Sequence, residues 1–176
     1  MRIPWFGLAL AGTTAFLIVL LFGPYVIRLL TKLKFGQTVR SDGPQTHQSK
    51  SGTPTMGGVL ILFGMAAGTI AGLGGNWSYH LIWTVFLTLA FGGLGLLDDL
   101  LIILFHRSLG LKARHKLLGQ VFFAGLFGLY VVQSGAMETL KIPYFNTHLA
   151  FINPVLTFLF VVFTIVAMSN AVNLTD

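Results

Sequence analysis

Two adjacent carboxylates, Asp98 and Asp99, follow the apolar run Leu81–Leu97. Ionised side chains cost roughly 2.5–3.5 kcal/mol or more at the centre of a bilayer and less near its edge, so an acidic pair on a membrane helix indicates a functional site. Successive helix residues lie about 100° apart, which predicts that the two acids have different roles. The alternative is that they mark the end of a helix and pair with Arg107 or Lys116.

A loop that could bind an anion precedes the second apolar run. Its sequence is Lys50-Ser-Gly-Thr-Pro-Thr-Met-Gly-Gly58. A purely structural interpretation makes Thr53 the N-cap and Pro54 the first residue of a helix. Backbone N–H groups at a helix start, glycines that allow close approach and Lys50 would also suit a phosphate. Magnesium binds through one or two carboxylates and substrate phosphate oxygens, so acids beside such a loop indicate metal-assisted phosphoryl chemistry. A carboxylate could also act as general base or as nucleophile.

The last eight residues, Ser169–Asp176, form a third polar cluster. An asparagine there could cap the C-terminus of a helix. Asn170 and Asn173 are three residues apart, however, and therefore share one face of a helix, which suits a common ligand better.

Composition places these clusters in a membrane protein. The 176 residues are 55% hydrophobic and 9% charged, with a mean hydropathy of +0.81, whereas soluble domains carry about 25% charged residues. Runs of about 20 apolar residues can cross a hydrocarbon core of about 30 Å. We therefore predict an all-α integral membrane protein with five spans. They are Trp5–Leu30, Met56–Gly74, Tyr79–Leu97, Leu117–Gln133 and Pro154–Val172.

Basic residues predict the orientation, because Lys and Arg in short loops remain cytoplasmic. Most of them lie at or in the first and third connections, whereas Arg2 and Lys141 lie on the other side. The N-terminus is therefore expected outside and the C-terminus in the cytoplasm, with the acidic pair and the polar clusters on the cytoplasmic face. Aromatic residues then gather at the outer interface. They are Trp5, Trp77, Tyr79 and Trp83.

The net charge of +6 has two interpretations. Basic loops orient any membrane protein and favour anionic lipids, but they would also attract a phosphorylated cytosolic substrate. The basic residues form no single stripe interleaved with aromatics, which argues against nucleic-acid binding. The sequence contains no cysteine and therefore no disulfide. Gly64, Gly68 and Gly72 recur every four residues, a spacing that predicts close helix packing.

Four motifs together resemble one family. Thr53–Gly58, Leu96–Asp99, Gly110–Gln120 and Asn170–Asp176 are similar, in order and spacing, to the signatures of the bacterial phospho-N-acetylmuramoyl-pentapeptide transferases (MraY) of the polyprenyl-phosphate sugar-phosphate transferase superfamily. The resemblance implies an enzyme of the bacterial inner membrane. It would transfer phospho-N-acetylmuramoyl-pentapeptide from its UDP carrier to undecaprenyl phosphate, giving lipid I and UMP with Mg²⁺ required. A homodimer is expected from the family.

The resemblance also implies roles for individual residues. Asp98 and Asp99 become catalytic acids, with the choice of base or nucleophile left open. Candidate substrate-binding residues match the other motifs: they are Lys50, Thr53, Thr55, Arg114, Lys116, Asn170, Asn173 and Asp176. Candidate metal ligands are Asp98, Asp99 and Asp176, while the main magnesium ligand is expected outside this chain. A short extracytoplasmic β-hairpin is expected near residues 138–151, where Pro143 and Asn146 could form the turn.

The chain departs from the family at two points. Ile102 occupies a position where the family usually has a lysine, which removes a phosphate-binding cation. The sequence ends at Asp176, within a motif. We therefore expect residues 1–176 to be the N-terminal half of the transferase domain, with about five of roughly ten spans, and to be inactive alone. Two alternatives are a sister enzyme that transfers an N-acetylhexosamine 1-phosphate to a polyprenyl phosphate, and a non-enzymatic membrane module.

Overall fold

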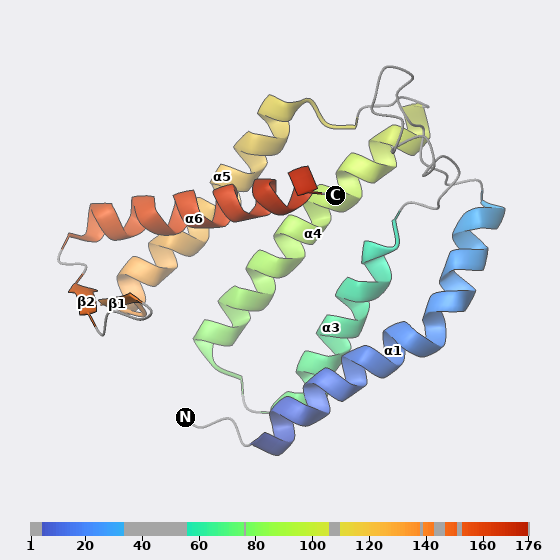
Figure 1. The fold of residues 1–176 in the computed structure, drawn as a ribbon, viewed down its shortest axis with the longest axis horizontal. Coiled ribbons are helices and arrows are strands. Elements are labelled where there is room, and N and C mark those ends of the chain that lie inside the picture. The colour runs from blue at the N-terminus through green and yellow to red at the C-terminus, as the bar shows by residue number, and fades with distance from the viewer. Residues whose placement is uncertain are drawn as a thin grey trace. The chain divides into compact units, whose positions relative to one another are not determined.

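In the computed structural model of the protein, most of the described residues form helices (Figure 1). The described residues are 5–33, 56–75, 77–105, 110–137, 139–142, 147–150 and 153–175. The helices are α1 (Trp5–Lys32), α3 (Gly58–Leu73), α4 (Tyr79–Phe105), α5 (Ala113–Ser134) and α6 (Pro154–Thr175). Two short strands, β1 (Thr139–Ile142) and β2 (Thr147–Ala150), lie between α5 and α6.

Four of these helices, α1, α4, α5 and α6, are long and apolar enough to cross a membrane. Helix α3 is apolar but has 16 residues. At 1.5 Å per residue it spans about 24 Å, less than the hydrocarbon thickness of about 30 Å. The predicted all-helical membrane class is therefore supported with four candidate spans, and a fifth span at α3 stays a prediction.

Polar residues begin two of the helices. The Asn153 Oδ1 atom accepts hydrogen bonds from the backbone N–H groups of Val155 (2.8 Å) and Leu156 (3.4 Å) ahead of α6, and Pro154 fits the first helical position because it lacks an N–H. Ser78 Oγ accepts a bond from Leu81 N at the start of α4. Each cap satisfies N–H groups that the helix itself leaves without a partner.

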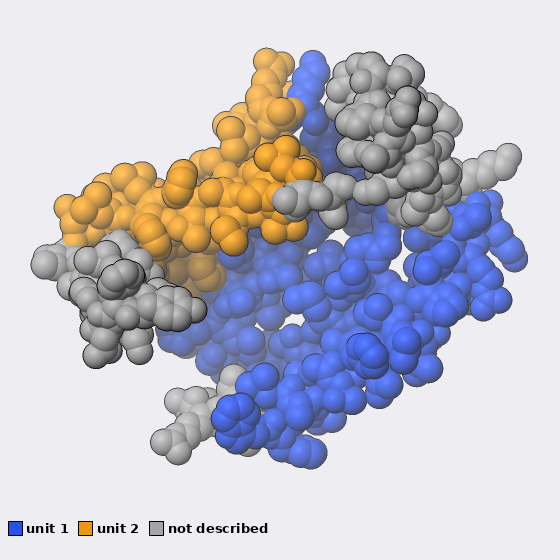
Figure 2. All heavy atoms as spheres, in the orientation of Figure 1, with its two compact units in different colours: residues 1–112 blue, residues 113–176 orange. Residues whose placement is uncertain are grey.

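The chain forms two compact units, Met1–Lys112 and Ala113–Asp176, which we call unit 1 and unit 2 (Figure 2). In unit 1, α3 packs against α1 and also contacts α4. In unit 2, α5 packs against α6.

The α1–α3 contact is built on small residues. A Cβ atom added to Gly64 would lie 3.1 Å from the Ala15 carbonyl oxygen, and one added to Gly72 would lie 2.5 Å from the Gly7 carbonyl oxygen. A Cβ atom on Gly68 would overlap the carbonyl oxygen of Ala11. The prediction that these three glycines serve close helix packing is confirmed.

Most large apolar side chains of the described residues are exposed, as in a protein whose solvent is lipid. Helix α4 has no buried residue in its most apolar stretch. Five threonine hydroxyls within helices, such as Thr84 and Thr88, donate to the carbonyl oxygen four residues earlier, which satisfies them without water. The chain is an integral membrane protein.

Strands β1 and β2 pair antiparallel, with Thr139 opposite Ala150 and Ile142 opposite Thr147. They lie in the range where the sequence predicts a hairpin. The connecting residues 143–146, with the expected turn formers Pro143 and Asn146, lie outside the described part of the chain. The turn and its side of the membrane stay predictions.

Several helix boundaries differ from the predicted ones, and three of them bear on the polar motifs. Helix α4 continues through the acidic pair to Phe105, because Leu100–Phe105 is an uninterrupted apolar run that favours helix, so the interpretation of the acids as a helix end is wrong. Helix α3 begins at Gly58, with Gly57 as N-cap, rather than at Pro54. Helix α5 begins at Ala113, about one turn before Leu117.

Candidate functional site

The two aspartates of α4 hold different segments of unit 1. The Leu111 backbone N–H donates to Asp98 Oδ1 at 2.6 Å. The Met56 backbone N–H donates to Asp99 Oδ2 at 3.2 Å. Both carboxylates are half-buried. The structure thus joins three segments that are far apart in sequence: the start of α3, the acidic pair, and the approach to α5.

Gly110 allows the close approach of its segment to Asp98. A Cβ atom at this position would overlap the Asp98 side-chain oxygen and carbonyl oxygen and would lie 2.9 Å from Asp98 Cγ. Gly110 does not have a positive φ angle. Glycine is therefore required here for space and not for an unusual backbone conformation. Sequence reasoning singled out the basic residues of this motif and missed Gly110.

Met56 has a left-handed backbone, with φ of 69°, and is the one such residue other than glycine in the described part of the chain. This conformation costs a residue with a side chain roughly 1–2 kcal/mol. The hydrogen bond from its N–H to Asp99 helps to hold that conformation. Gly57 and Gly58 follow, and a Cβ atom on either would meet no atom within 4 Å.

The predicted basic contacts lie in the first turn of α5. Arg114 is exposed and Lys116 is half-buried. The first turn of α5 contains no acidic residue, although the partial positive charge of a helix N-terminus favours anions and disfavours cations. This arrangement of cations on a helix start would suit a phosphate.

The two predicted asparagines lie within α6, so the alternative that either caps the helix is wrong. Asn173 is exposed and Asn170 is half-buried. The Asn170 Nδ2 atom donates to Gln120 Oε1 of α5 and to the Val166 carbonyl oxygen, both at 2.8 Å. Gln120 was missed as a site residue, although an amide inside the apolar run Leu117–Gln133 was the available signal.

Four predicted site residues lie outside the described part of the chain: Lys50, Thr53, Thr55 and Asp176. Arg107, the alternative ion-pair partner, is also outside it. Among the described candidates, the structure brings Asp98 and Asp99 together in unit 1. It places Arg114, Lys116, Asn170 and Asn173 in unit 2.

The metal prediction depends on the acidic pair. In the part of the chain that the structure describes, no group of three or more His, Cys, Asp or Glu residues is placed to hold a metal. Magnesium requires only one or two carboxylates when phosphate oxygens and water complete its six ligands. The half-buried carboxylates of Asp98 and Asp99 supply oxygen donors of this kind, so they fit such a shared site.

Two family models match parts of the chain that include the candidate site. Residues 81–176 match the model of glycosyl transferase family 4, and residues 50–62 match the phospho-N-acetylmuramoyl-pentapeptide-transferase signature 1. Met56 thus lies in that signature, while Asp98 and Asp99 lie in the family match.

Curated bacterial proteins named phospho-N-acetylmuramoyl-pentapeptide-transferase are similar to the chain. The protein from Listeria innocua is 44% identical over 169 residues, which cover 92% of this chain and 50% of that relative. The protein from Neisseria meningitidis serogroup C is 43% identical over 176 residues, covering 97% of this chain and 48% of that relative. The chain spans about half the length of the curated relatives it matches. It belongs to glycosyl transferase family 4 and is similar, in its signature and over half the length of these relatives, to the phospho-N-acetylmuramoyl-pentapeptide transferases.

Proposed function

We propose that this chain contributes two catalytic acids, Asp98 and Asp99, to an active site. The enzyme would transfer phospho-N-acetylmuramoyl-pentapeptide from its UDP carrier to undecaprenyl phosphate. Because the chain spans about half the length of its relatives, we propose the reaction for a protein of their length. The observation that carries the proposal is the meeting of three motif segments at Asp98 and Asp99. A pair of aspartates with no role beyond helix structure would not require this convergence.

In the proposed reaction, an oxygen of the lipid phosphate forms a bond to the sugar-bearing phosphorus of the UDP donor. The bond from that phosphorus to the bridging oxygen breaks, and UMP leaves with this oxygen. One aspartate would accept the proton of the lipid phosphate as general base, or would attack the sugar-bearing phosphorus first as nucleophile. Magnesium, when bound, would neutralise the charge of the donor's phosphates.

The remaining candidate residues would bind the substrates. Arg114 and Lys116 at the start of α5 would bind phosphate oxygens. Lys50, Thr53 and Thr55, in or beside the signature segment, would contact the nucleotide. Asn170, Asn173 and Asp176 would complete the polar lining. We propose that this site lies on the cytoplasmic face, where a soluble nucleotide sugar meets a membrane-held lipid.

The test measures magnesium-dependent release of UMP in a full-length protein that contains residues 1–176. With UDP-N-acetylmuramoyl-pentapeptide and undecaprenyl phosphate, the wild type is expected to turn over. Asp98→Asn and Asp99→Asn are expected to lower kcat by about 100-fold or more, because each removes a carboxylate that acts as acid or base. Residues 1–176 alone are expected to show no turnover.

Other outcomes would contradict parts of this proposal. Undiminished turnover in both asparagine variants would remove the catalytic role of the pair. Wild-type activity with a UDP-N-acetylhexosamine but not with the muramoyl donor would identify a sister enzyme. No activity with either donor, with folding retained, would favour a non-enzymatic membrane module.

A further inference from the structure

A chain of hydrogen bonds joins α5 to α6 inside unit 2. Gln120 is 3% exposed, although it lies in a helix otherwise suited to lipid. Its Nε2 atom donates to Ser169 Oγ at 3.4 Å. Its Oε1 atom accepts from Asn170 Nδ2 at 2.8 Å. The Asn170 Nδ2 atom also donates to the Val166 carbonyl oxygen.

The direction of this chain follows from its last acceptor. A backbone carbonyl oxygen can only accept, so the Asn170 atom that faces Val166 must be the amide nitrogen. The same nitrogen faces Gln120, which must therefore present its oxygen. The Gln120 amide nitrogen is then directed to Ser169. One backbone group thus fixes the orientation of both side-chain amides.

The asparagine amide group has two N–H bonds, and both are used within unit 2. Its Oδ1 atom makes no hydrogen bond among the described residues. Any ligand of this half-buried side chain would therefore meet an acceptor. An acceptor oxygen binds an O–H group, an N–H group or a cation, and it repels the oxygens of a phosphate.

We propose that Gln120 is a positioning residue that directs the Asn170 carbonyl oxygen toward an electropositive group of the bound substrate complex. The proposal rests on the proposed function, in which Asn170 lines the substrate site. Asn170 would then bind a hydroxyl or amide donor of the nucleotide sugar, or the magnesium ion, rather than the phosphates. This role would also explain why a polar side chain, Gln120, is buried within a membrane helix.

A purely structural role is the competing explanation, because polar side chains commonly join membrane helices by hydrogen bonds. Both explanations predict that losing Gln120 lowers stability. Only the positioning role predicts that the activity lost with Gln120 depends on Asn170. A double-mutant cycle separates the two.

The experiment uses the full-length protein with Gln120→Met, Asn170→Ala and the double variant. Gln120→Met is expected to lower kcat/KM about tenfold, since it removes the buried acceptor of the Asn170 amide. The double variant is expected to be no worse than Asn170→Ala. Gln120→Glu is expected to rescue activity, because a neutral carboxylic acid keeps an acceptor toward Asn170 and a donor toward Ser169. Gln133→Met, the same change at an exposed position of α5, is the control and is expected to match the wild type.

Kinetic constants of Asn170→Ala identify the ligand group. A higher KM for the UDP donor at saturating magnesium would assign an O–H or N–H donor. A higher magnesium concentration for half-maximal activity would assign the cation. No change in either constant would overturn the proposal. Additive losses of kcat/KM for Gln120→Met and Asn170→Ala in the double variant would also overturn it.

Thermal unfolding tests the contact independently of the reaction. The drop in Tm of the double variant is expected to be smaller than the sum of the two single drops. Additive drops would overturn the hydrogen-bonded chain even in an active enzyme. A wild type that lacks turnover would instead overturn the proposed function, while the Tm cycle would still decide whether Gln120 holds Asn170.

Discussion

Asp98 and Asp99 are neighbours in sequence but hold different parts of unit 1. One oxygen of Asp98 accepts the N–H of Leu111, and one oxygen of Asp99 accepts the N–H of Met56. Because each side chain is oriented by a separate segment, a change in one segment should affect one carboxylate more than the other. The expected division of roles between the two acids therefore has a structural basis, although the roles themselves stay a prediction.

Gly110→Ala tests the segment that holds Asp98. The added methyl group would overlap the Asp98 carboxylate, and a catalytic group displaced by about 1 Å can cost about 100-fold in rate. We expect kcat to fall by about this factor while the KM for the UDP donor changes little. The measurement is steady-state UMP release by the full-length protein.

The control for this variant is Gly95→Ala in the same helix as the acidic pair. A Cβ atom there would meet nothing within 4 Å, so kcat should be unchanged. Equal loss in both variants would show that the effect of Gly110→Ala does not arise from contact with Asp98.

At the scale of elements, the pairing of α1 with α3 depends on glycine. Membrane helices gain no hydrophobic energy by leaving lipid for one another, so close backbone packing must supply the attraction. The stripe formed by Gly64, Gly68 and Gly72 lies against carbonyl oxygens and small residues of α1. This pairing also helps to place the start of α3, and with it Met56, beside Asp99.

Gly68→Leu is expected to separate α1 from α3. The side chain has no space beside Ala11 and Ala15, and such overpacking costs roughly 1–3 kcal/mol or more. The Tm of the detergent-solubilised protein should fall. Gly12→Leu places the same side chain on α1 where no atom lies within 4 Å, and it should leave Tm near that of the wild type. A stable Gly68→Leu variant would contradict the packing shown here.

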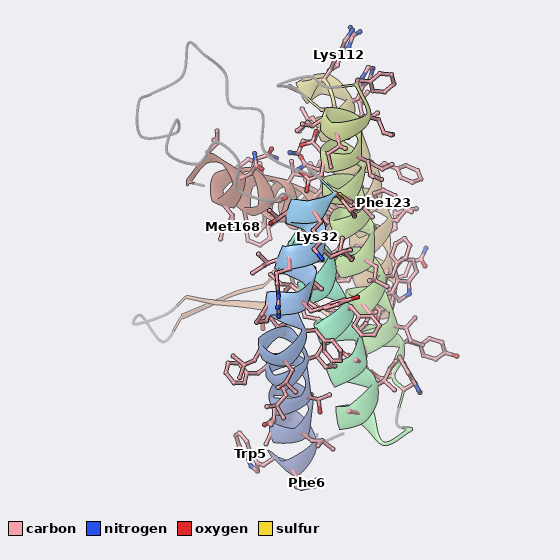
Figure 3. The ribbon with its side chains drawn as sticks, turned by 90° about the vertical axis from the view of Figure 1, so that its right-hand side faces the viewer. Trp5, Phe6, Lys32, Lys112, Phe123 and Met168 are labelled. Atoms are coloured by element: carbon pink, nitrogen blue, oxygen red, sulfur yellow. The ribbon has the colours of Figure 1, made fainter. Side chains whose placement is uncertain are left out.

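The two ends of unit 1 differ in chemistry. Trp5 and Phe6 lie at one end of α1 and Lys32 at the other (Figure 3). The end of α3 lies beside Gly7, which puts the α3–α4 connection at the aromatic end, whereas Met56 and Leu111 meet the acidic pair at the basic end. This distribution agrees with aromatic residues outside and basic residues in the cytoplasm, and the orientation stays a prediction.

Single-cysteine variants test the orientation, because the chain contains no cysteine of its own. Tyr79→Cys, at an 80% exposed position, should react with a membrane-impermeant thiol reagent in intact cells. Lys112→Cys, also exposed, should react only after the membrane is opened. The reverse pattern would place the acidic pair on the outer face.

Several features of the molecule were predictable from sequence because they depend on local composition. Apolar runs of membrane length predicted where the helices lie, and the four-residue spacing of Gly64, Gly68 and Gly72 predicted a packing face. Four motifs together, one of which ends in Asp98 and Asp99, predicted the family. Boundaries were less accurate at these polar motifs, because helix α4 continues through its acids while their carboxylates bind backbone groups from other segments.

Only the tertiary structure decided which residues support the candidate site. Gly110 is distinguished by its distance from Asp98, and Gln120 by its bond to Asn170. Both contacts depend on segments that the chain must fold to bring together. The sequence shows Gln120 as an amide within an apolar run, but it does not show which side chain that amide binds, and no local pattern distinguishes Gly110. The sequence by itself determined a membrane protein of this transferase family, with acids and amides at definite positions. The fold decided which backbone N–H groups orient the two aspartates and that the buried Gln120 orients Asn170. Hydrogen bonds and steric overlap depend on positions in space, which the sequence alone does not give.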